Sequence, residues 1–455
     1  MGTRRAIAVW DETCHGDAAW RPTAPRHVRR AERREGPMTT NRIASLLAAL
    51  SLLAPAAAHA TNGMRMIGFS PVQDAMGGVG VGATLDAASL LTNPAGMADL
   101  GRRLELGGSY FKPSVSYSAS GSGPMPQMFV ANDGASLDSD RGASPIPLLA
   151  YVQPVTDRLT TGIGVFGVAG MGVDYGMNLY NGPTLTSYMQ GRFTPAAAYR
   201  VSDRLSLGVT ANLMVAQMEY DVASGAGQAA HDTATSFGAG ATFGVKYSPV
   251  KRVSFGAAYE TRSWFQDFSF TVPERPNPMT GGTNPAGTDE LAFDQPQSAT
   301  LGVAVTPVDA LLLAVDVQWI DWSSTMGDGL PQYSSDPMAT GAMPFDMGWS
   351  DQWVVKVGTQ VMATPKLALR AGYNYGKMPL DPDRAFENMA FPAVSEHHVT
   401  AGAGYVFSDR LSANVAGVYA LNASIEGANP AEQGISSYST EMSQLAVDVA
   451  LCYRF

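Results

Sequence analysis

Residues 444–455 read QLAVDVALCYRF, and this last stretch of the chain decides the fold class. Every second residue is apolar, and the residues between are polar or small. A period of two is the pattern of a β-strand with one apolar face. The apolar residues of this stretch are Leu445, Val447, Val449, Leu451, Tyr453 and Phe455.

The same alternation recurs upstream, in residues 205–215, 311–319 and 367–376. No segment after residue 60 has 18 consecutive apolar residues, so helical membrane spans are not expected. Only 15% of the residues are charged, and the chain has 48 glycines. This composition suits a transmembrane β-barrel, in which every second residue faces lipid. The net charge of −10 argues against a nucleic-acid partner.

The connections between the alternating segments are of two kinds. Six are short and contain Asp, Ser or Pro, which favour tight reversals; they lie at 156–159, 202–205, 248–251, 306–309, 364–366 and 408–411. Seven are long and polar, near 119–143, 172–190, 221–234, 271–294, 323–348, 377–394 and 424–440. Short periplasmic turns opposite long outer loops are the rule in bacterial barrels. The sequence therefore predicts an all-β, antiparallel transmembrane barrel of about 14 strands over residues 103–455.

The N-terminal residues predict export. Residues 38–60 contain Arg42, an apolar run over 43–58 and the sequence Ala-His-Ala at 58–60, the pattern of a signal peptide and its cleavage site. The Arg-rich residues 1–37 have no periodicity, and we expect them to be a non-native upstream extension. An exported barrel belongs in the bacterial outer membrane, which it crosses many times.

Residues 61–102 do not alternate and are rich in Gly and Ala. They include the glycine-rich stretch 77–82, the sequence DAAS at 86–89, and Asn93, Pro94, Ala95 and Gly96. About 42 residues are too few for a separate domain with its own core. Fourteen strands enclose more space than side chains fill, so we expect this segment to be a luminal plug, or hatch.

These segments, with residues 195–206 (PAAAYRVSDRLS) and 370–379 (RAGYNYGKMP), resemble the FadL/TodX (OMPP1) family of outer-membrane transporters for long-chain fatty acids and other hydrophobic compounds. The resemblance covers residues 61–455. Where the family usually has an aromatic residue before Asn-Pro-Ala, this chain has Leu90, Leu91 and Thr92, which leaves the plug contacts open.

The resemblance implies functional roles for two groups of residues. Asn93, Pro94, Ala95 and Gly96 would belong to a plug whose rearrangement releases substrate, unless they only cap and turn it. Substrate would leave sideways through a distortion of the third strand. That strand is residues 159–172 here, and its glycines suit a kink or bulge; they include Gly164, Gly167 and Gly170.

Two outer loops contain many apolar residues. Met is flexible and suits varied apolar ligands, and exposed apolar patches often mark binding sites. We expect substrate capture at these loops, although the same residues would also pack loop against loop. The candidates are Met177, Leu179, Tyr180, Met189, Met326, Leu330, Met338 and Phe345.

Alternation also places charged residues on the luminal face. A luminal cation would hold a carboxylate headgroup, which favours fatty acids over neutral hydrocarbons. The candidates are Lys246, Arg262, Lys356 and Arg370, with pairing to one another or to the plug as the alternative. Four tryptophans near outer strand ends predict an aromatic girdle at the membrane interface; they are Trp319, Trp322, Trp349 and Trp353.

The predicted function is outer-membrane transport of hydrophobic molecules, with long-chain fatty acids as the first candidate cargo and aromatic or alkane hydrocarbons as the second. We expect a monomer surrounded by outer-membrane lipids, and recognition of the terminal Phe455 by the barrel-assembly machinery. We expect no enzymatic activity, cofactor or metal site. A general porin would have no plug, and an outer-membrane lipase would need a nucleophile motif near His231, His397 or His398, which does not stand out.

Overall fold

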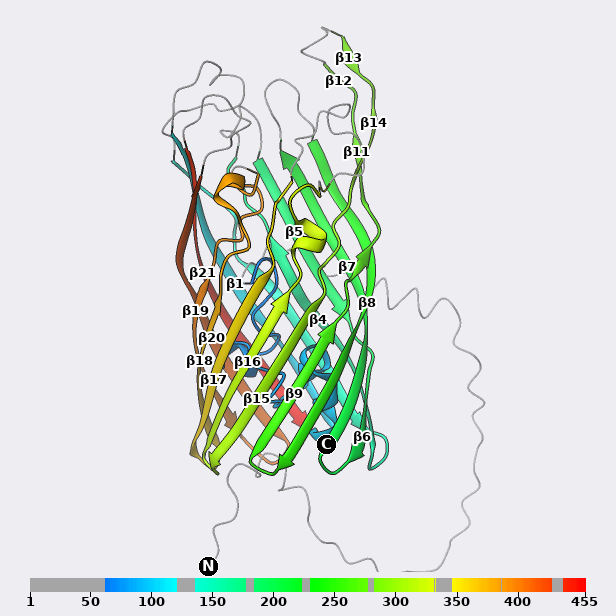
Figure 1. The fold of residues 1–455 in the computed structure, drawn as a ribbon, viewed down its shortest axis with the longest axis vertical. Helices are drawn as coiled ribbons and strands as arrows, with labels where there is room; N and C mark the ends of the chain where they lie inside the picture. Colours follow the sequence, from blue (N-terminus) through cyan, green and yellow to red (C-terminus); the bar gives the residue numbers. More distant parts are fainter. Residues whose placement is uncertain are drawn as a thin grey trace, which may run out of the picture.

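The computed structural model describes residues 62–120, 136–176, 184–222, 230–276, 282–330, 332, 346–385, 387–427 and 437–455. It is a closed antiparallel β-barrel (Figure 1). The barrel closes because the first strand, β1 (Arg103–Ser120), pairs with the last, β21 (Ser437–Arg454), along its whole length. No helix in the described ranges is long and apolar enough to cross a membrane.

The wall has the predicted fourteen strands, with β5 and β6 forming one interrupted strand. After β1 they are β3 (Ser144–Pro154), β4 (Leu159–Met171), β5 (Thr184–Phe193) with β6 (Ala196–Ser202), β7 (Leu205–Val222), β8 (Ala230–Val250), β9 (Val253–Glu260), β15 (Ser298–Val308), β16 (Leu311–Ile320), β17 (Gln352–Thr364), β18 (Leu367–Gly376), β19 (His397–Val406), β20 (Leu411–Gly427) and β21. Short pieces extend it: β2 (Ser136–Asp138), β10 (Trp264–Phe265), β11 (Phe268–Val272), β12 (Arg275–Pro276), β13 (Thr283–Asn284) and β14 (Gly287–Leu291).

All six predicted turns join consecutive wall strands, and they lie together at one end of the barrel (Figure 1). The strands run further into the predicted loops than expected. The prediction that Met189 lies in a loop is wrong, because β5 begins at Thr184 and continues its pairing with β7. The alternation is confirmed along β21, where Val449 and Leu451 are more than half exposed and Asp448 and Cys452 are buried.

The predicted aromatic girdle is wrong for two of its four tryptophans. Trp353 is 62% exposed on the outer surface. Trp322 and Trp349 are fully buried, with their ring centroids 4.8 Å apart. The reason is that β16 ends at Ile320, after which the chain turns into the short helix α5 (Ser323–Met326) and its side chains enter the core.

The upper part of the barrel is filled with apolar side chains, which we call the upper chamber. Wall residues meet residues of the long connections there, in one buried cluster. The cluster includes Tyr117, Tyr188, Tyr220, Phe268, Phe270, Phe293, Trp322, Met326, Met347, Trp349, Met389, Phe391 and Tyr438. Wall strands thus provide one side of this core and the folded-in outer connections provide the other.

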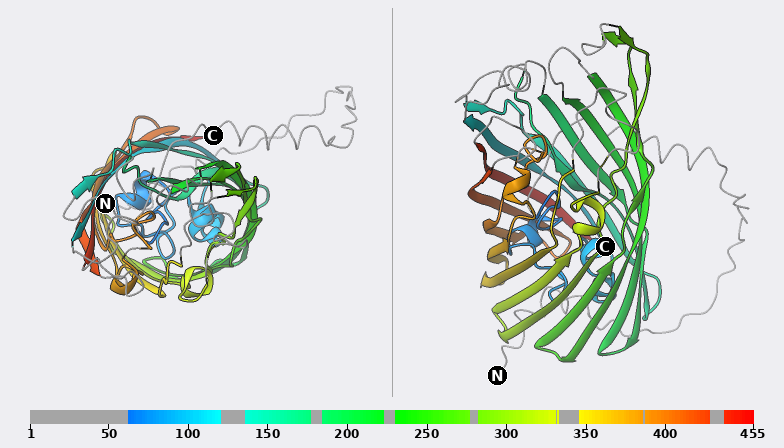
Figure 2. Two further views of the ribbon diagram at one scale, coloured as in Figure 1. Left: turned by 90° about the horizontal axis from the view of Figure 1, so that it is seen from above. Right: turned by 45° about the horizontal axis from the view of Figure 1, so that its top comes forward.

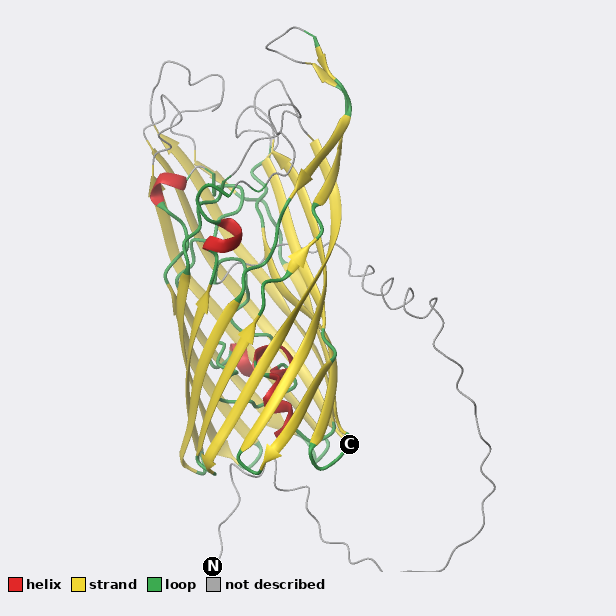
Figure 3. Cartoon of the chain, turned by 45° about the vertical axis from the view of Figure 1, so that its right-hand side comes forward, coloured by secondary structure: helices red, strands yellow, loops and turns green. Residues whose placement is uncertain are grey.

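The lower part of the barrel holds residues 62–102, which we call the plug (Figures 2 and 3). It contains the short helices α2 (Pro71–Asp74), α3 (Ser89–Thr92) and η3 (Pro94–Asp99). The Ser70 hydroxyl accepts a hydrogen bond from Gln73 N at 3.2 Å and so caps α2, and Pro71 suits its first turn. The Asn93 side chain caps η3 in the same way, through Ala95 N.

Candidate functional site

The plug rests on glycines of the barrel wall. A Cβ atom at Gly208 of β7 would lie 2.2 Å from Ala95 N, and one at Gly244 of β8 would lie 2.2 Å from Asn93 Oδ1. The missing side chains therefore let the plug backbone contact the wall directly. Asn93 is fully buried, and its Nδ2 donates to the carbonyls of Val81 and Val245 at 3.0 Å each. The Asn-Pro-Ala segment thus fixes the plug to β8, and we call this contact the seat.

A single wall carboxylate holds a second part of the plug. Asp316 of β16 is 1% exposed and accepts hydrogen bonds from the consecutive amides of Gly80, Val81 and Gly82, at 2.8, 2.8 and 3.1 Å. Successive backbone N–H groups arranged in this way form an anion-binding concavity. The glycine-rich stretch of the plug therefore wraps around a carboxylate of the wall.

The plug also contains two buried acids. Burial and the neighbouring Asp448 raise the pKa of Asp74 well above its ordinary value. Burial also raises the pKa of Asp86, although the Ser70 hydroxyl donates a hydrogen bond to its carboxylate. These plug carboxyls therefore favour their protonated form more strongly than exposed carboxyls do.

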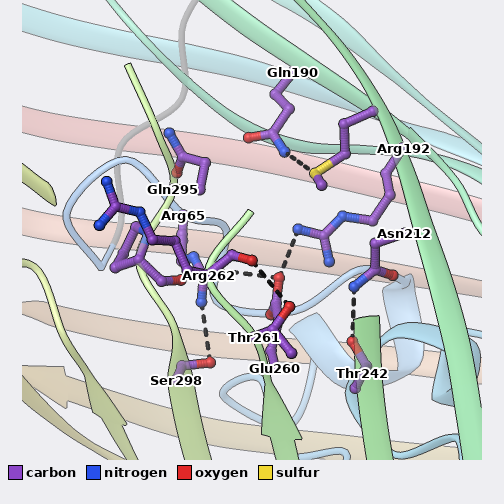
Figure 4. Close-up of polar contacts among 12 residues, drawn as sticks. Arg65, Gln190, Arg192, Asn212, Thr242, Glu260, Thr261, Arg262, Gln295 and Ser298 are labelled. Atoms are coloured by element: carbon purple, nitrogen blue, oxygen red, sulfur yellow. Dashed lines mark hydrogen bonds and ion pairs between the residues drawn. The ribbon is translucent and has the colours of Figure 1, made fainter. Parts of the chain in front are cut away.

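A charged cluster lies in the lumen just beside the plug (Figure 4). Glu260 of β9 is 3.1 Å from the Arg65 guanidinium of the plug and 2.7 Å from the Arg192 guanidinium of β5. Arg65 also donates to Ser298 Oγ and Pro296 O, at 3.1 Å each. The buried Nε of Arg192 has no hydrogen-bond partner among the described residues. The cluster therefore carries two cations for one carboxylate and keeps a free donor.

A cavity lies between this cluster, the plug and the wall. Its unfilled space is about 700 Å³, the part open to solvent included. Arg65, Arg192 and Glu260 line it together with the apolar side chains of Met66, Phe69 and Val168. An amphiphile with a negative headgroup matches this combination of surfaces. No group of three or more His, Cys, Asp or Glu is placed to hold a metal ion in the described part of the chain.

The wall has a gap between its second and third strands. The β3–β4 ladder runs from Pro154↔Thr160 to Leu148↔Phe166 and stops there, while the β1–β3 ladder continues to Phe111↔Ser144. Residues 144–147 of β3 and 167–171 of β4 therefore face each other without pairing. We call this the wall gap.

Two prolines explain why the ladder stops. The carbonyl of Leu149 faces β4 and that of Ile146 faces β1. Because alternate residues of a strand bond to opposite neighbours, residues 145 and 147 must face β4. Both are prolines, which have no N–H to donate. The sequence of β3 thus supplies no N–H donors to β4 beyond the last pair, Leu148↔Phe166.

The plug replaces the missing partner of β4. A bulge at Val168 shifts the β4–β5 register between Gly167↔Gly191 and Ala169↔Gln190. Beyond it, Met66 N donates to Val168 O at 3.3 Å and Gly170 N donates to Met64 O at 3.1 Å. Residues 64–66, which we call the plug arm, thus bond to the free edge of β4.

The upper end of the wall gap, towards the long outer connections, is closed by residues that precede β3. Asp140 N donates to Asp174 O at 2.8 Å. The Arg141 guanidinium donates to Thr186 O and Ser187 Oγ of β5, at 2.7 Å each. These bonds span the gap above β4, so the gap is a window with a lower edge at Phe166 and an upper edge at Arg141.

A model of the family described as outer membrane protein transport protein (OMPP1/FadL/TodX) matches residues 47–455. The chain belongs to this family. The family's members are outer-membrane transporters of hydrophobic compounds, and the predicted family and fold class are thereby confirmed. No curated protein sequence matches the chain.

Solved structures share the fold of the family at low sequence identity. The P. putida toluene transporter TodX is 21% identical, with a TM-score of 0.69 over 85% of this chain and 99% of TodX. A Pseudomonas aeruginosa FadL homologue is 17% identical, with a TM-score of 0.71 over 86% of this chain and 100% of its own. The Ralstonia pickettii toluene transporter TbuX is 20% identical, with a TM-score of 0.63 over 85% and 98%.

The four predicted luminal cations contact the plug, the wall or an outer connection rather than converging on one point. Lys246 forms an ion pair with Asp99 of the plug at 2.9 Å, and the Lys356 ammonium donates to Ile67 O at 3.0 Å. Arg262 pairs with Asp294 at 2.8 Å. The Arg370 guanidinium donates to Gln360 Oε1 and Asn414 Oδ1.

The predicted capture residues are only partly within the described residues. Met177, Leu179, Tyr180, Met338 and Phe345 lie outside them. Leu330 is 43% exposed, as a capture surface requires. Met326 is fully buried in the upper chamber, because α5 turns inward, and Met189 is half-buried in β5.

Sequence reasoning did not show which residues meet in the charged cluster, nor that the wall has a gap. Arg65, Arg192 and Glu260 are far apart in the chain, and nothing local links them. Pro145 and Pro147 did leave a signal, since prolines at alternate positions of a predicted strand exclude pairing on one side. Of the glycines named from the family resemblance, Gly167 borders the bulge in β4 and Gly170 lies two residues beyond Val168.

Proposed function

We propose that this transporter carries long-chain fatty acids across the outer membrane. The observation that supports this cargo is the charged cluster, in which Arg192 has a free buried donor and two arginines face one carboxylate. A fatty-acid carboxylate would bring the cluster to charge balance and accept the free Nε–H. A neutral hydrocarbon gains nothing from these groups.

The proposed path begins at the apolar outer connections and the upper chamber, where aromatic and Met side chains suit a hydrocarbon tail. The headgroup then reaches the charged cluster beside the plug. Displacing Glu260 from Arg65 would weaken the hold on the plug arm, which is bonded to β4 at the wall gap. Release of the arm would let the cargo leave sideways into the bilayer.

Neutral aromatic hydrocarbons are the second candidate cargo. The upper chamber is lined largely by aromatic rings, including Tyr188 and Phe293 with centroids 4.8 Å apart. Two of the similar solved proteins, TodX and TbuX, are toluene transporters. A ring-shaped cargo would enter this chamber by stacking on such rings.

We further propose that the protein acts as a monomeric transporter and not as an enzyme or an open pore. The plug occupies the lumen and is held by Asn93 and Asp316, so its rearrangement must precede passage. The proposed partners are outer-membrane lipids, which surround the apolar outer face, and the barrel-assembly machinery, which would recognise Phe455.

The test is uptake of radiolabelled oleate and toluene by cells that lack their own transporter and express this protein. We expect oleate uptake that falls about tenfold in Arg192→Met, a loss of roughly 1.4 kcal/mol, and recovers partly in Arg192→Lys. We also expect Arg192→Met to leave any uptake of toluene unchanged. Toluene uptake alone would favour the second cargo, and leakage of sugars in place of both would mean a porin.

A further inference from the structure

The wall gap is not an empty hole, because one side chain occupies it. Ile146 of β3 points inward and is 5% exposed. A Cβ atom on Gly167 of β4 would lie 2.3 Å from Ile146 Cγ2. The Ile146 side chain therefore takes the space that the missing side chain of Gly167 leaves. The two residues face each other beyond the last β3–β4 pair, Leu148↔Phe166, so the ladder does not join the strands at this point.

The inner side of Ile146 belongs to a small apolar cluster with Ile67, Phe111, Val418 and Ala446, against which Met66 packs. Ile67 and Met66 are plug residues, and Met66 is part of the plug arm. The plug and the wall thus hold Ile146 from inside. If the arm leaves β4, this side chain loses part of the packing that keeps it against Gly167.

Behind the cluster lies an apolar cavity inside the wall. Met66, Ile67, Phe111, Val418 and Ala446 line it, together with three polar side chains; these are Asp74, Gln444 and Asp448. Below the gap, the paired parts of β3 and β4 present lipid-facing residues on the outer surface, since Leu149 and Ile163 are 43% and 50% exposed. Ile146 packs in the cluster whose other members line this cavity, and so it lies between the apolar interior and the wall gap.

We propose that Ile146 is the gate residue of the lateral exit and that its size, against Gly167, sets the width of cargo that passes. This inference rests on the proposed function, because it assumes that cargo leaves through the wall gap. A narrow acyl chain passes once Ile146 moves inward, whereas a wider group requires a smaller residue at position 146.

The test compares uptake of oleate with uptake of a fatty acid that carries a bulky fluorescent ring system. Ile146→Ala should raise the ratio of bulky to narrow uptake about tenfold, which corresponds to roughly 1.4 kcal/mol. Gly167→Val should lower uptake of both, because its side chain would meet Ile146. The matched control is Leu148→Ala, which removes an equally buried, inward-facing residue of the same strand where β3 and β4 are still paired.

The amount of folded barrel in the outer membrane is measured for each variant, and uptake is divided by it. The gate is overturned if the ratio of bulky to narrow uptake is unchanged in Ile146→Ala, or if it changes equally in Leu148→Ala. In either case the proposed function still stands, provided that the wild type takes up oleate. Absence of uptake of either fatty acid by the wild type overturns the proposed function and the gate with it.

Discussion

Arg65 of the plug and Glu260 of strand β9 form an ion pair, with 3.1 Å between Nη2 and Oε1 and side chains that are 9% and 15% exposed. Because the plug arm around Arg65 also bonds to β4, this pair links one contact of the third wall strand to the seventh, β9. The same carboxylate binds Arg192 at 2.7 Å. Glu260 is therefore a shared anchor whose loss affects both arginines.

Glu260→Gln should destabilise the barrel. It leaves two buried guanidinium groups without their carboxylate, and breaking a buried pair in this way costs about 3 kcal/mol. The free energy of unfolding in lipid vesicles, measured by urea titration, checks this. The control is Asp309→Asn, which breaks an exposed pair with Arg252 and should cost less than about 1 kcal/mol. Similar losses in the two variants would show that the luminal pair is no anchor.

Gly244→Val should displace the plug. Its Cβ would lie 2.2 Å from Asn93 Oδ1, and the buried Asn-Pro-Ala seat has no room to retreat. We expect a several-fold rise in ion conductance across a planar bilayer. Gly417→Val is the control, because a Cβ there has no neighbour within 4 Å. If Gly244→Val conducts no more than wild type, the seat does not hold the plug closed.

Replacing both prolines of the wall gap, in Pro145→Thr/Pro147→Thr, should extend the β3–β4 ladder. Two regained N–H donors would stabilise the barrel by about 1–3 kcal/mol, at roughly 1 kcal/mol per hydrogen bond. Closing the gap should also reduce oleate uptake. Pro154→Thr changes the same strand outside the gap and serves as the control. Normal uptake by the double variant, with the ladder shown to be extended by hydrogen exchange, would exclude the lateral exit.

Asp74→Asn should change how stability depends on pH. Burial, with the nearby Asp448, raises the pKa of Asp74 in the folded protein. The protonated form is therefore favoured by folding, and its contribution to stability is lost as the pH rises through the raised pKa. We expect the variant to be more stable than wild type at pH 8 and to differ little from it at acidic pH. Asp203→Asn, on an exposed turn, should leave the pH profile unchanged.

Much of the architecture could be predicted from local patterns. Alternation in segments such as residues 444–455 fixes which side chains face lipid, and turn residues such as Asp203 mark the short connections. The burial of Trp322 could not be predicted, because it depends on the residue at which the chain leaves strand β16. The meeting of Arg65, Arg192 and Glu260 depends on how the closed barrel brings β5 and β9 to the plug, which no residue spacing shows.

The bond between the plug arm and β4 also has a consequence for assembly. A strand whose N–H and C=O groups have no partner is a template for pairing with another chain, and proteins usually cover such edges. The two prolines of β3 leave β4 with such an edge, and residues 64–66 cover it from within the same molecule. A barrel that closes before its N-terminal segment is in place would expose this edge to neighbouring barrels. We therefore expect the segment that precedes the first strand also to keep the newly inserted protein from pairing edge to edge with another copy.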